Sequence, residues 1–460
     1  MAESTKQDLR YRPLLILLGL SVLARIGLFA FTSPGIIYSW DSTRFARTVP
    51  GFESLFSDYW MPAGYPYYLT VTHALSDQLW VPIAGQHLLG LGAAVALFLA
   101  LRRLELSRAV ATIGSAVLLV PGDLIFLEHA LLIESLMLSF TVLACCAAIR
   151  GLVPTVDWRW LVAAGVLAGA AMVLRNIGLI VIPVLIGVAL FATAKPWRAR
   201  LTSGAAVAAG AAIVLAIYAG AFQASGGRYA GISDMSGWYQ YSRVAPFADC
   251  SQFTPPEGTK QFCDKSEISK RPGPVFYIWY RKPAPVPETD ALAGEFARAV
   301  VKAQPGGYVI AVSTDLARYV GPTIGGGDRG ATGSSYMEFD SAALTPSYIK
   351  LDRNRLAKRY SGTDESRRGI NVLGSYQRIV RIHGLLLPLM AIVAIAGLIK
   401  VRGPRRIAIT MFLLISAGVL ILPTMTFTYS YRYGVASGAL LAIAALIATA
   451  SIVESRSRDA

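Results

Sequence analysis

The run Leu14–Phe31, which reads LLILLGLSVLARIGLFAF, decides the fold of this chain. An apolar run of this length is sufficient to cross a bilayer as a helix. Lys6, Arg10 and Arg12 precede the run, and no small-residue cleavage site follows it. We therefore interpret Leu14–Phe31 as an uncleaved first transmembrane helix.

The composition indicates a membrane protein with many spans. Hydrophobic residues make up 54% of the 460 residues, charged residues make up 15%, and the mean hydropathy is +0.50. Soluble domains carry roughly 25% charged residues, so most of this surface is expected to face lipid. The net charge of +15 could suggest nucleic acid, but the basic residues gather in short loops at span ends, as membrane topology requires. We therefore expect no nucleic-acid partner.

The apolar runs predict an all-α polytopic membrane protein with about ten transmembrane helices. Only Arg175 and Asn176 separate the fifth run from the sixth, which predicts a tight hairpin there. The runs lie at 13–32, 80–101, 109–127, 130–149, 160–174, 177–194, 203–222, 380–399, 407–424 and 434–453.

Basic residues alternate along these spans. They fall at both termini and in every second connection, so the positive-inside rule places all of these segments in the cytoplasm. The opposite, exoplasmic face then carries the first loop at 33–79, and we expect the protein in the plasma membrane with its active site on that face. The basic residues are Arg10, Arg12, Arg102, Arg103, Arg108, Arg150, Arg159, Lys195, Arg198, Arg200, Lys400, Arg402, Arg405, Arg406, Arg456 and Arg458.

Three parts are predicted. An N-terminal transmembrane module at 1–222 precedes an exoplasmic soluble insert at 223–377, and a C-terminal transmembrane module occupies 378–460. The insert is polar, rich in Gly and Pro, and too long for a connecting loop. Apolar spacing predicts helices at 289–303 and 307–319 within it, so the insert is expected to be helix-rich.

The four cysteines occupy two kinds of position. Cys250 and Cys263 lie in the insert, on the predicted oxidising side, and would close a short loop, so we expect a disulfide between them. Cys145 and Cys146 lie in an apolar span and are expected to be inert core thiols. The glycine-rich stretch 325–335 predicts a mobile loop.

Asp41 follows the first span directly, between aromatic residues. A loop acid or helix cap at the membrane surface is one interpretation. The neighbours Tyr38, Trp40 and Phe45, with further apolar positions at near-helical intervals, instead suggest a helix lying in the interface. Partial desolvation of an acid there would raise its basicity, which suits a general base.

A second group of acids surrounds the predicted fourth span. Glu128 and His129 belong to a short exoplasmic turn, whereas Glu134 is expected inside the following span, about one and a half turns deep. An acid within a span is usually functional or paired, and Glu134 is one candidate partner for Arg25 of the first span. His129 is expected to be an interfacial or hydrogen-bonding residue. Four scattered histidines give no metal-ligand pattern.

Arg175 and Arg432 lie at exoplasmic span ends. Each is either a snorkelling interfacial arginine or a phosphate ligand, for which a guanidinium is geometrically suited. The chain has no Walker A sequence, no GxSxG and no HExxH. Without a cytoplasmic nucleotide site, an activated substrate is expected to reach the outer face already attached to lipid.

These residues together resemble the GT-C superfamily of membrane glycosyltransferases. Within it, the chain is most similar to the protein O-mannosyltransferase and lipid A aminoarabinose transferase branch, which uses polyprenyl-phosphate sugars. Some members have an adjacent Asp-Glu pair where this chain has one acid, and Pro is frequent where it has Asn176. The similar stretches are Tyr38-Ser39-Trp40-Asp41, Met61-Pro62-Ala63-Gly64-Tyr65-Pro66, Ala130-Leu131-Leu132-Ile133-Glu134-Ser135-Leu136 and Leu174-Arg175-Asn176-Ile177-Gly178-Leu179.

The resemblance implies an inverting glycosyl transfer from a polyprenyl-phosphate sugar to an acceptor hydroxyl. Asp41 would accept the hydroxyl proton, and Glu128 or Glu134 would orient the acceptor or an arginine. Cations must stabilise the leaving lipid phosphate. The expected phosphate ligands are Arg175, Arg432 and, behind them, Arg44; the expected acceptor or lipid contacts are Tyr38, Trp40, Tyr65 and His129.

The resemblance leaves several alternatives open. The sugar is not specified, and the acceptor could be a glycan, a lipid, a protein or a small molecule. No cofactor is implied, although an acid pair could recruit a divalent metal. A transporter or flippase for a lipid-linked glycan would predict acids and broken helices at mid-membrane, usually with internal repeats. A non-catalytic assembly subunit would predict no dependence on Asp41.

Overall fold

The computed structural model describes residues 2–37, 41–49, 55–56, 58–191, 196–226, 233–321, 353–364, 366, 368–382 and 384–459. Over these residues the chain is helical, with isolated β-bridges from Ile36 to Ala130 and from Gln78 to Ser361 and no longer strand. Tyr38, Trp40 and the stretch 325–335 lie outside the described residues.

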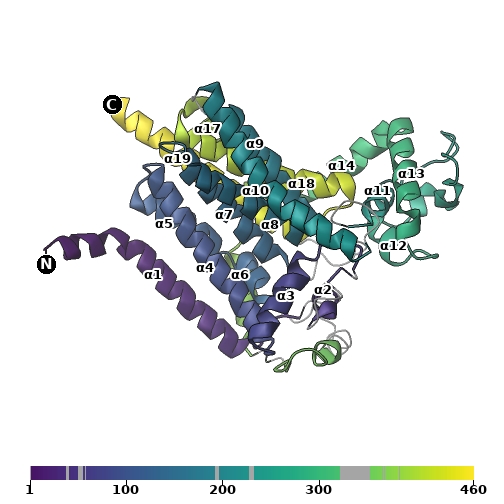
Figure 1. Ribbon diagram of the computed structural model, residues 1–460, viewed down its shortest axis with the longest axis horizontal. Helices are drawn as coiled ribbons and strands as arrows, with labels where there is room; N and C mark the ends of the chain where they lie inside the picture. The colour runs from purple at the N-terminus through teal and green to yellow at the C-terminus, as the bar shows by residue number, and fades with distance from the viewer. Residues whose placement is uncertain are drawn as a thin grey trace.

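The helices follow one another along the whole described chain (Figure 1). The α-helices are α1 (Ala2–Phe31), α2 (Asp41–Phe45), α3 (Gly64–Leu75), α4 (Trp80–Arg103), α5 (Arg108–Leu119), α6 (Gly122–His129), α7 (Glu134–Leu152), α8 (Trp158–Leu174), α9 (Val181–Phe191), α10 (Trp197–Ala224), α11 (Ser236–Val244), α12 (Pro274–Trp279), α13 (Asp290–Ala303), α14 (Pro305–Tyr319), α16 (Ile370–Ile379), α17 (Leu386–Lys400), α18 (Pro404–Thr426) and α19 (Tyr431–Asp459). Short 3₁₀ turns are η1 (Ala46–Thr48), η2 (Asn176–Ile180), η3 (Lys260–Phe262), η4 (Ile268–Lys270) and η5 (Pro287–Thr289).

The all-α polytopic membrane class is confirmed, because each predicted apolar run coincides with one or more helices. Six helices are long and apolar enough to span a membrane: α1, α4, α7, α10, α18 and α19. The pair α5 and α6 makes a seventh candidate, bent by 51° at Pro121, which lacks the N–H that would continue the helix. Three apolar helices, α8, α9 with η2, and α17, are shorter. The count of ten spans stays a prediction.

Helix α7 lies inside the bundle and α1 lies at its edge. The apolar window of α7 is 83% buried and that of α1 is 22% buried. Helix α7 packs on α4 and α8, whereas α1 contacts α5 and α4 and stands apart from the other spans in Figure 1. The outer face of α1 is therefore left for lipid.

Three of the predicted basic loops meet at one end of the bundle. Arg103 Nε donates to Val153 O at 2.5 Å, and Arg405 Nε donates to Leu104 O at 2.9 Å. Helix α7 runs from Glu134 to Leu152, so this gathering lies at the end of the bundle opposite Glu134.

The predicted insert contains a compact helical unit with its own core. Helices α11 to α14 lie beyond the ends of the spans in Figure 1, and the core of the unit includes Trp238, Tyr241, Phe262 and Phe296. The expected helices at 289–303 and 307–319 are present as α13 and α14. Trp60 of the first loop belongs to the same core.

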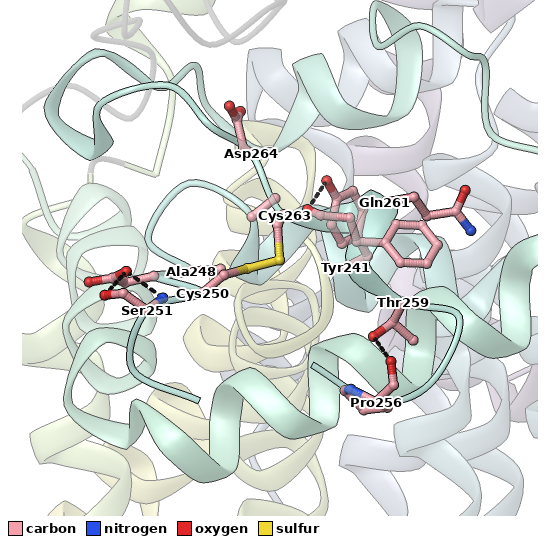
Figure 2. Close-up of a disulfide and its surroundings, with 12 residues drawn as sticks. Tyr241, Ala248, Cys250, Ser251, Pro256, Thr259, Gln261, Cys263 and Asp264 are labelled. Carbon is pink, nitrogen blue, oxygen red and sulfur yellow. Dashed lines mark hydrogen bonds between the residues drawn. A yellow bond between two sulfur atoms is a disulfide. The ribbon is translucent and has the colours of Figure 1, made fainter. Parts of the chain in front are cut away.

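Cys250 and Cys263 are joined by a disulfide in this unit, which is the pairing expected from the sequence. Figure 2 shows the bond beside Tyr241, whose hydroxyl donates to Phe262 O at 3.1 Å. Cys145 and Cys146 are buried free thiols of α7.

The later part of the predicted insert lies elsewhere. Leu356, Tyr360 and Ile370 belong to the core of the spans and not to the core of α11 to α14. Helix α16 packs against α6, where Gln377 Nε2 donates to Asp123 Oδ1 at 2.8 Å. The described residues of 223–377 therefore form two separate parts, one on each side of the first loop.

Candidate active site

A short parallel bridge brings Asp41 next to Glu134. Ile36 N donates to His129 O at 2.9 Å, and Leu131 N donates to Ile36 O at 3.0 Å. After this pairing the chain enters α2, whose first residue is Asp41, while the other strand segment leads to α7, whose first residue is Glu134. Two helix N-termini bearing carboxylates thus point into one region, where the helix dipole favours negative charge.

Glu134 lies at the end of a helix and not one and a half turns inside it. The expectation of a deeper position is wrong, because α6 ends at His129 and Ala130 has an extended backbone. The bridge to Ile36 holds this segment extended, which delays the start of α7 to Glu134. The side chain is nevertheless fully buried.

Asp41, Arg432, Glu134 and Arg175 form a chain of alternating charges that ends at the hydroxyl of Tyr433. We call these five side chains the Asp41 cluster. Arg432 Nη1 donates to Asp41 Oδ2 at 2.7 Å and lies 3.1 Å from Glu134 Oε1. Arg175 Nη1 donates to Glu134 Oε1 at 2.6 Å, and Arg175 Nε and Nη2 donate to the Tyr433 hydroxyl at 3.0 and 2.6 Å. Two carboxylates and two of the three predicted phosphate ligands, Arg175 and Arg432, therefore occupy one site.

One carboxylate oxygen of this cluster lacks a partner. Glu134 Oε2 is buried and has no hydrogen bond to any described residue, and the same holds for Asn176 Oδ1, next to Arg175. Buried polar atoms in folded proteins are almost always paired, so an unpaired one often marks a place for a ligand, water or ion. No group of three or more His, Cys, Asp and Glu side chains suited to a metal occurs among the described residues.

Asp41 is a carboxylate with a depressed pKa. Burial opposes its ionisation, but the guanidiniums of Arg432, Arg175 and Arg44 outweigh burial and hold the pKa of the carboxyl below its usual 3.8. The expectation that desolvation raises the basicity of Asp41 is therefore wrong in this state, because the arginines lie close to it. Displacement of Arg432 toward a phosphate would remove the strongest of these charges.

Two glycines explain why the backbone turns at Arg175. A Cβ on Gly64 would lie 2.3 Å from Val173 O, and one on Gly178 would lie 2.4 Å from Ala171 O. Helix α8 ends at Leu174 and Arg175 is extended, with its N–H still donating to Ala171 O. The stretch Pro62-Ala63-Gly64-Tyr65-Pro66 thus supplies a residue without a side chain, Gly64, at the place where α3 meets the end of α8.

Arg44 is paired and lies beside the insert. It forms a two-pronged ion pair with Asp58, with Nη2 donating to Asp58 Oδ1 at 2.6 Å, and its guanidinium lies 4.9 Å from the Trp279 ring centroid. Tyr239 of α11 packs on Trp60 and is close enough to interact electrostatically with Arg44. Burial raises the pKa of Tyr239 to about 12, so its hydroxyl stays protonated.

Asp58, Tyr433 and Tyr239 were not predicted from the sequence. Asp58 is a further acid in the loop that carries Asp41, so the sequence alone could have pointed to it as a site residue. Tyr433 directly follows Arg432 in an aromatic stretch. Nothing in the sequence connects Tyr239 of the insert to the first loop.

Glu128 belongs to a different group, which we call the Glu128 network and which comprises Arg25, His87, Glu128 and His129. Arg25 Nη2 and Nε donate to Glu128 Oε2 at 2.6 and 3.1 Å, and His87 Nδ1 lies 2.9 Å from the same oxygen. His87 Nε2 lies 3.1 Å from His129 Nδ1, and His129 Nε2 donates to Thr32 O at 2.6 Å. The partner of Arg25 is therefore Glu128 and not Glu134.

Tyr65 and His129 are fully buried and face neither lipid nor solvent. The Tyr65 hydroxyl donates to Gln86 Oε1 at 2.7 Å, and Gln86 Nε2 donates to Glu128 O at 2.8 Å. In this arrangement both predicted contact residues support the bridge segment instead of meeting a substrate. Tyr38 and Trp40 lie outside the described residues.

The comparisons with known proteins agree with the sequence motifs. Residues 63–224, which comprise α3 to α10, match the model of the family described as dolichyl-phosphate-mannose-protein mannosyltransferase. Over 63–224 the chain is therefore similar to this mannosyltransferase family, which agrees with the motifs found in that part of the chain. The matched segment includes Glu134 and Arg175, whereas Asp41 and Arg432 lie outside it. A comparison with curated proteins gives no match.

Two solved structures are similar over most of this chain. One is the archaeal oligosaccharyltransferase AglB from Archaeoglobus fulgidus, in complex with an inhibitory peptide and a dolichol-phosphate, with 12% identity, a TM-score of 0.46 and coverage of 98% of this chain and 51% of that one. The other is ArnT from Cupriavidus metallidurans in the apo state, with 15% identity, a TM-score of 0.36 and coverage of 98% and 78%. The chain spans about half the length of AglB.

Proposed function

We propose that this protein is an inverting glycosyltransferase that moves a sugar from a polyprenyl-phosphate donor to an acceptor hydroxyl. The observation that carries the proposal is the Asp41 cluster, in which Arg432 lies 2.7 Å from Asp41 and 3.1 Å from Glu134. The family match supports it, because the matched family is named for mannosyl transfer from dolichyl phosphate.

Asp41 serves as the general base in this scheme. It accepts the proton of the acceptor hydroxyl while the hydroxyl oxygen forms a bond to the anomeric carbon from the face opposite the phosphate. The bond between that carbon and the phosphate oxygen breaks, and polyprenyl phosphate leaves. One bond to the anomeric carbon replaces another, which inverts its configuration.

Arg175 and Arg432 bind the leaving phosphate. Both guanidiniums are held by carboxylates, so a phosphate would replace one anion with another on each arginine and would leave Asp41 without its counter-ion. The loss of Arg432 to phosphate would raise the pKa of Asp41 and make it a stronger base only when the donor is present. Glu134 contacts both arginines and holds them together. The ion pair of Arg44 with Asp58 forms the side of the site that faces the insert.

The reaction is placed on the exoplasmic face of the plasma membrane, with both termini in the cytoplasm. The support is that the loops of Arg103 and Arg405 gather at the end of the bundle opposite Glu134. A disulfide in the insert, which packs on the first loop, fits an oxidising compartment.

The test is a transfer assay with purified protein, a panel of polyprenyl-phosphate sugars and acceptors of each class. Asp41→Asn is expected to lower the rate roughly 10²–10⁴-fold, the usual contribution of a general base, with unchanged thermal unfolding. Asp157→Asn is the matched control, because Asp157 caps α8 at the opposite end of the bundle and Asn caps helices equally well.

Three outcomes would contradict the proposal. If no donor in the panel supports transfer by the wild-type protein, a transporter or an assembly subunit becomes the better interpretation. If Asp41→Asn transfers sugar at the wild-type rate, Asp41 is not the base. Product analysis by NMR checks inversion, and a retained anomeric configuration would exclude the single-displacement scheme.

A further inference from the structure

A large pocket lies in the insert, outside the Asp41 cluster. Its volume is about 670 Å³, within the range of sites that hold small molecules. Its walls come from the end of α11, the segment leading into α12, and α14, and Thr428 of the loop before α19 completes it. The mechanism above makes no use of this pocket.

The charges of the pocket favour an anion. Arg243, Arg271 and Arg318 line it together with a single acid, Asp315, so the formal charge of the lining is +2. The guanidinium of Arg271 is occupied by the backbone, because it donates to the carbonyls of Ser266, Ala245, Ala248 and Asp264. Its charge remains in the wall while its hydrogen bonds hold the loop.

Arg243 supplies donors that the described protein does not use. Its side chain is only 3% exposed, and Nη1 donates to Asp315 Oδ2 at 2.6 Å. Its Nε and Nη2 are buried and have no hydrogen-bond partner among the described residues. A buried guanidinium with two unpaired nitrogens, which carry three N–H groups, is an expensive arrangement that an anionic ligand would relieve.

Aromatic rings stand in the same wall. Phe276 is 40% exposed and Tyr280 is 59% exposed, with ring centroids 6.3 Å apart and planes 24° from parallel. Phe247 lines the pocket from the end of α11. Large apolar faces beside a few charged groups suit a ligand with a flat apolar face and a charge, such as an acidic sugar ring.

The pocket and the Asp41 cluster share structural elements. Tyr239 and Arg243 lie one turn apart on the same face of α11, and Tyr239 approaches Arg44. Asp315 accepts a hydrogen bond from Tyr429 N at 3.1 Å, three residues before Arg432. The pocket and the Asp41 cluster are therefore connected through α11 and through the loop before α19.

We propose that this pocket binds an acidic sugar unit of the acceptor, which makes the acceptor a glycan that carries carboxylate or phosphate groups. That the bound sugar belongs to the acceptor rests on the proposed function. Binding of an acidic sugar in the pocket does not itself require sugar transfer. Arg243 and Arg318 would bind the acidic group, and Phe276 and Tyr280 would contact the face of the sugar ring.

The experiment measures binding of three probes to the purified full chain by saturation-transfer NMR and calorimetry. The probes are methyl β-glucuronide, glucose 6-phosphate and neutral methyl β-glucoside. At least one acidic probe is expected to bind 10-fold or more tightly than the neutral one. The comparison of glucuronide with glucose 6-phosphate tells whether the recognised group is a carboxylate or a phosphate.

Variants place the binding in the pocket. Thr314→Trp fills the pocket from an exposed position of α14 and is expected to abolish binding, whereas the adjacent Ser313→Trp, which does not line the pocket, is the matched control. Arg318→Gln removes a partly exposed charge and is expected to lose most of the preference for acidic probes. Arg243→Gln should do the same but breaks a buried ion pair, so Arg318→Gln carries the conclusion if that variant fails to fold.

Two results would overturn the proposal: equal binding of neutral and acidic probes, or equal effects of the two tryptophans. Asp41→Asn is expected to keep full binding. Binding without any transfer by the wild-type protein would overturn the proposed function and leave the pocket. Transfer without acidic-sugar binding would do the reverse.

Discussion

The Asp41 cluster and the Glu128 network are both buried, both contain an Arg–Glu pair, and their glutamates are six residues apart in the sequence. They differ in how completely they are paired. In the Glu128 network, both nitrogens of His87 and of His129 have partners, and Glu128 Oε2 binds Arg25 and His87. In the Asp41 cluster, Glu134 Oε2 has no partner among the described residues.

This difference separates a supporting role from a chemical one. The Glu128 network holds α6 to α1 and α4, because Arg25 and His87 both contact Glu128 Oε2. In the Asp41 cluster, Glu134 Oε2 has no hydrogen-bond partner among the described residues. Its two arginines are bound to carboxylates that a phosphate could replace. Charge and burial alone do not distinguish the two glutamates, but the pairing of their atoms does.

The comparison predicts opposite effects for the two glutamates, and the loss of stability in Glu128→Gln is the largest effect on folding that we expect. Glu128→Gln leaves Arg25 buried without its counter-ion and is expected to lower stability by roughly 3–5 kcal/mol. Glu134→Gln is expected to lower the transfer rate by at least about 10-fold and to lose less stability than Glu128→Gln. Stability is retained because Arg175 still donates to the Tyr433 hydroxyl and Arg432 still pairs with Asp41. Thermal unfolding and initial rates, measured on the same preparations, check both.

The reverse pattern, with a stable but inactive Glu128→Gln protein, would exchange the roles of the two groups.

Arg175 offers the next largest effect. Arg175→Met removes one phosphate ligand and is expected to lower kcat/KM for the donor roughly 10²–10³-fold, as for a lost donor to a developing anion. Arg175→Lys should recover only part of it, because an ammonium cannot bind Glu134 and Tyr433 in the same plane. Rates at varied donor and fixed acceptor measure this. A change in the acceptor KM alone would show that Arg175 is misassigned.

Gly64 tests whether the close backbone contact between α3 and the end of α8 is needed to position Arg175 in the Asp41 cluster. Gly64→Ala places a Cβ 2.3 Å from Val173 O and should push α3 away from the end of α8, destabilising the protein by about 1–3 kcal/mol and displacing Arg175. Gly92→Ala on α4 is the control, because nothing lies within 4 Å of its Cβ. Equal stability and transfer of the two variants would contradict a tight contact at Gly64.

The smallest expected effect concerns pH. Because the arginines depress the pKa of Asp41 below 3.8, the carboxylate is ionised throughout the neutral range, and the stability from its ion pair with Arg432 is lost only as pH falls through that depressed pKa. Arg432→Gln removes the strongest opposing charge, so burial should raise the pKa of Asp41. The acid limb of the profile of kcat/KM against pH should then shift to higher pH.

An unshifted acid limb in Arg432→Gln would mean that the limb reports another group.

The apolar helices were predictable because a bilayer demands long apolar runs, and the stretches at Glu134 and Arg175 lie within the segment that matches the mannosyltransferase family. The position of Glu134 was not, since the extended segment at Ala130 depends on pairing with Ile36, almost a hundred residues earlier. Nor was the partner of Arg25 predictable, because rotation of α1 and α6 about their axes decides which glutamate it meets. The depressed pKa of Asp41 required knowing that three arginines from separate elements converge on it.

The loop before α19 has a consequence for anyone who wishes to re-engineer this protein. Asp315 accepts from Tyr429 N, the Tyr319 hydroxyl accepts from Ser430 N, and Arg243 Nη1 reaches Phe427 O at 3.4 Å. The residues that set the start of α19 are thus anchored to the insert, although the topology assigns them to the spans. A chimaera that exchanges the insert at the span boundaries would keep Arg432 in the sequence while losing the anchor that aims it. The loop and α14 must be transplanted together.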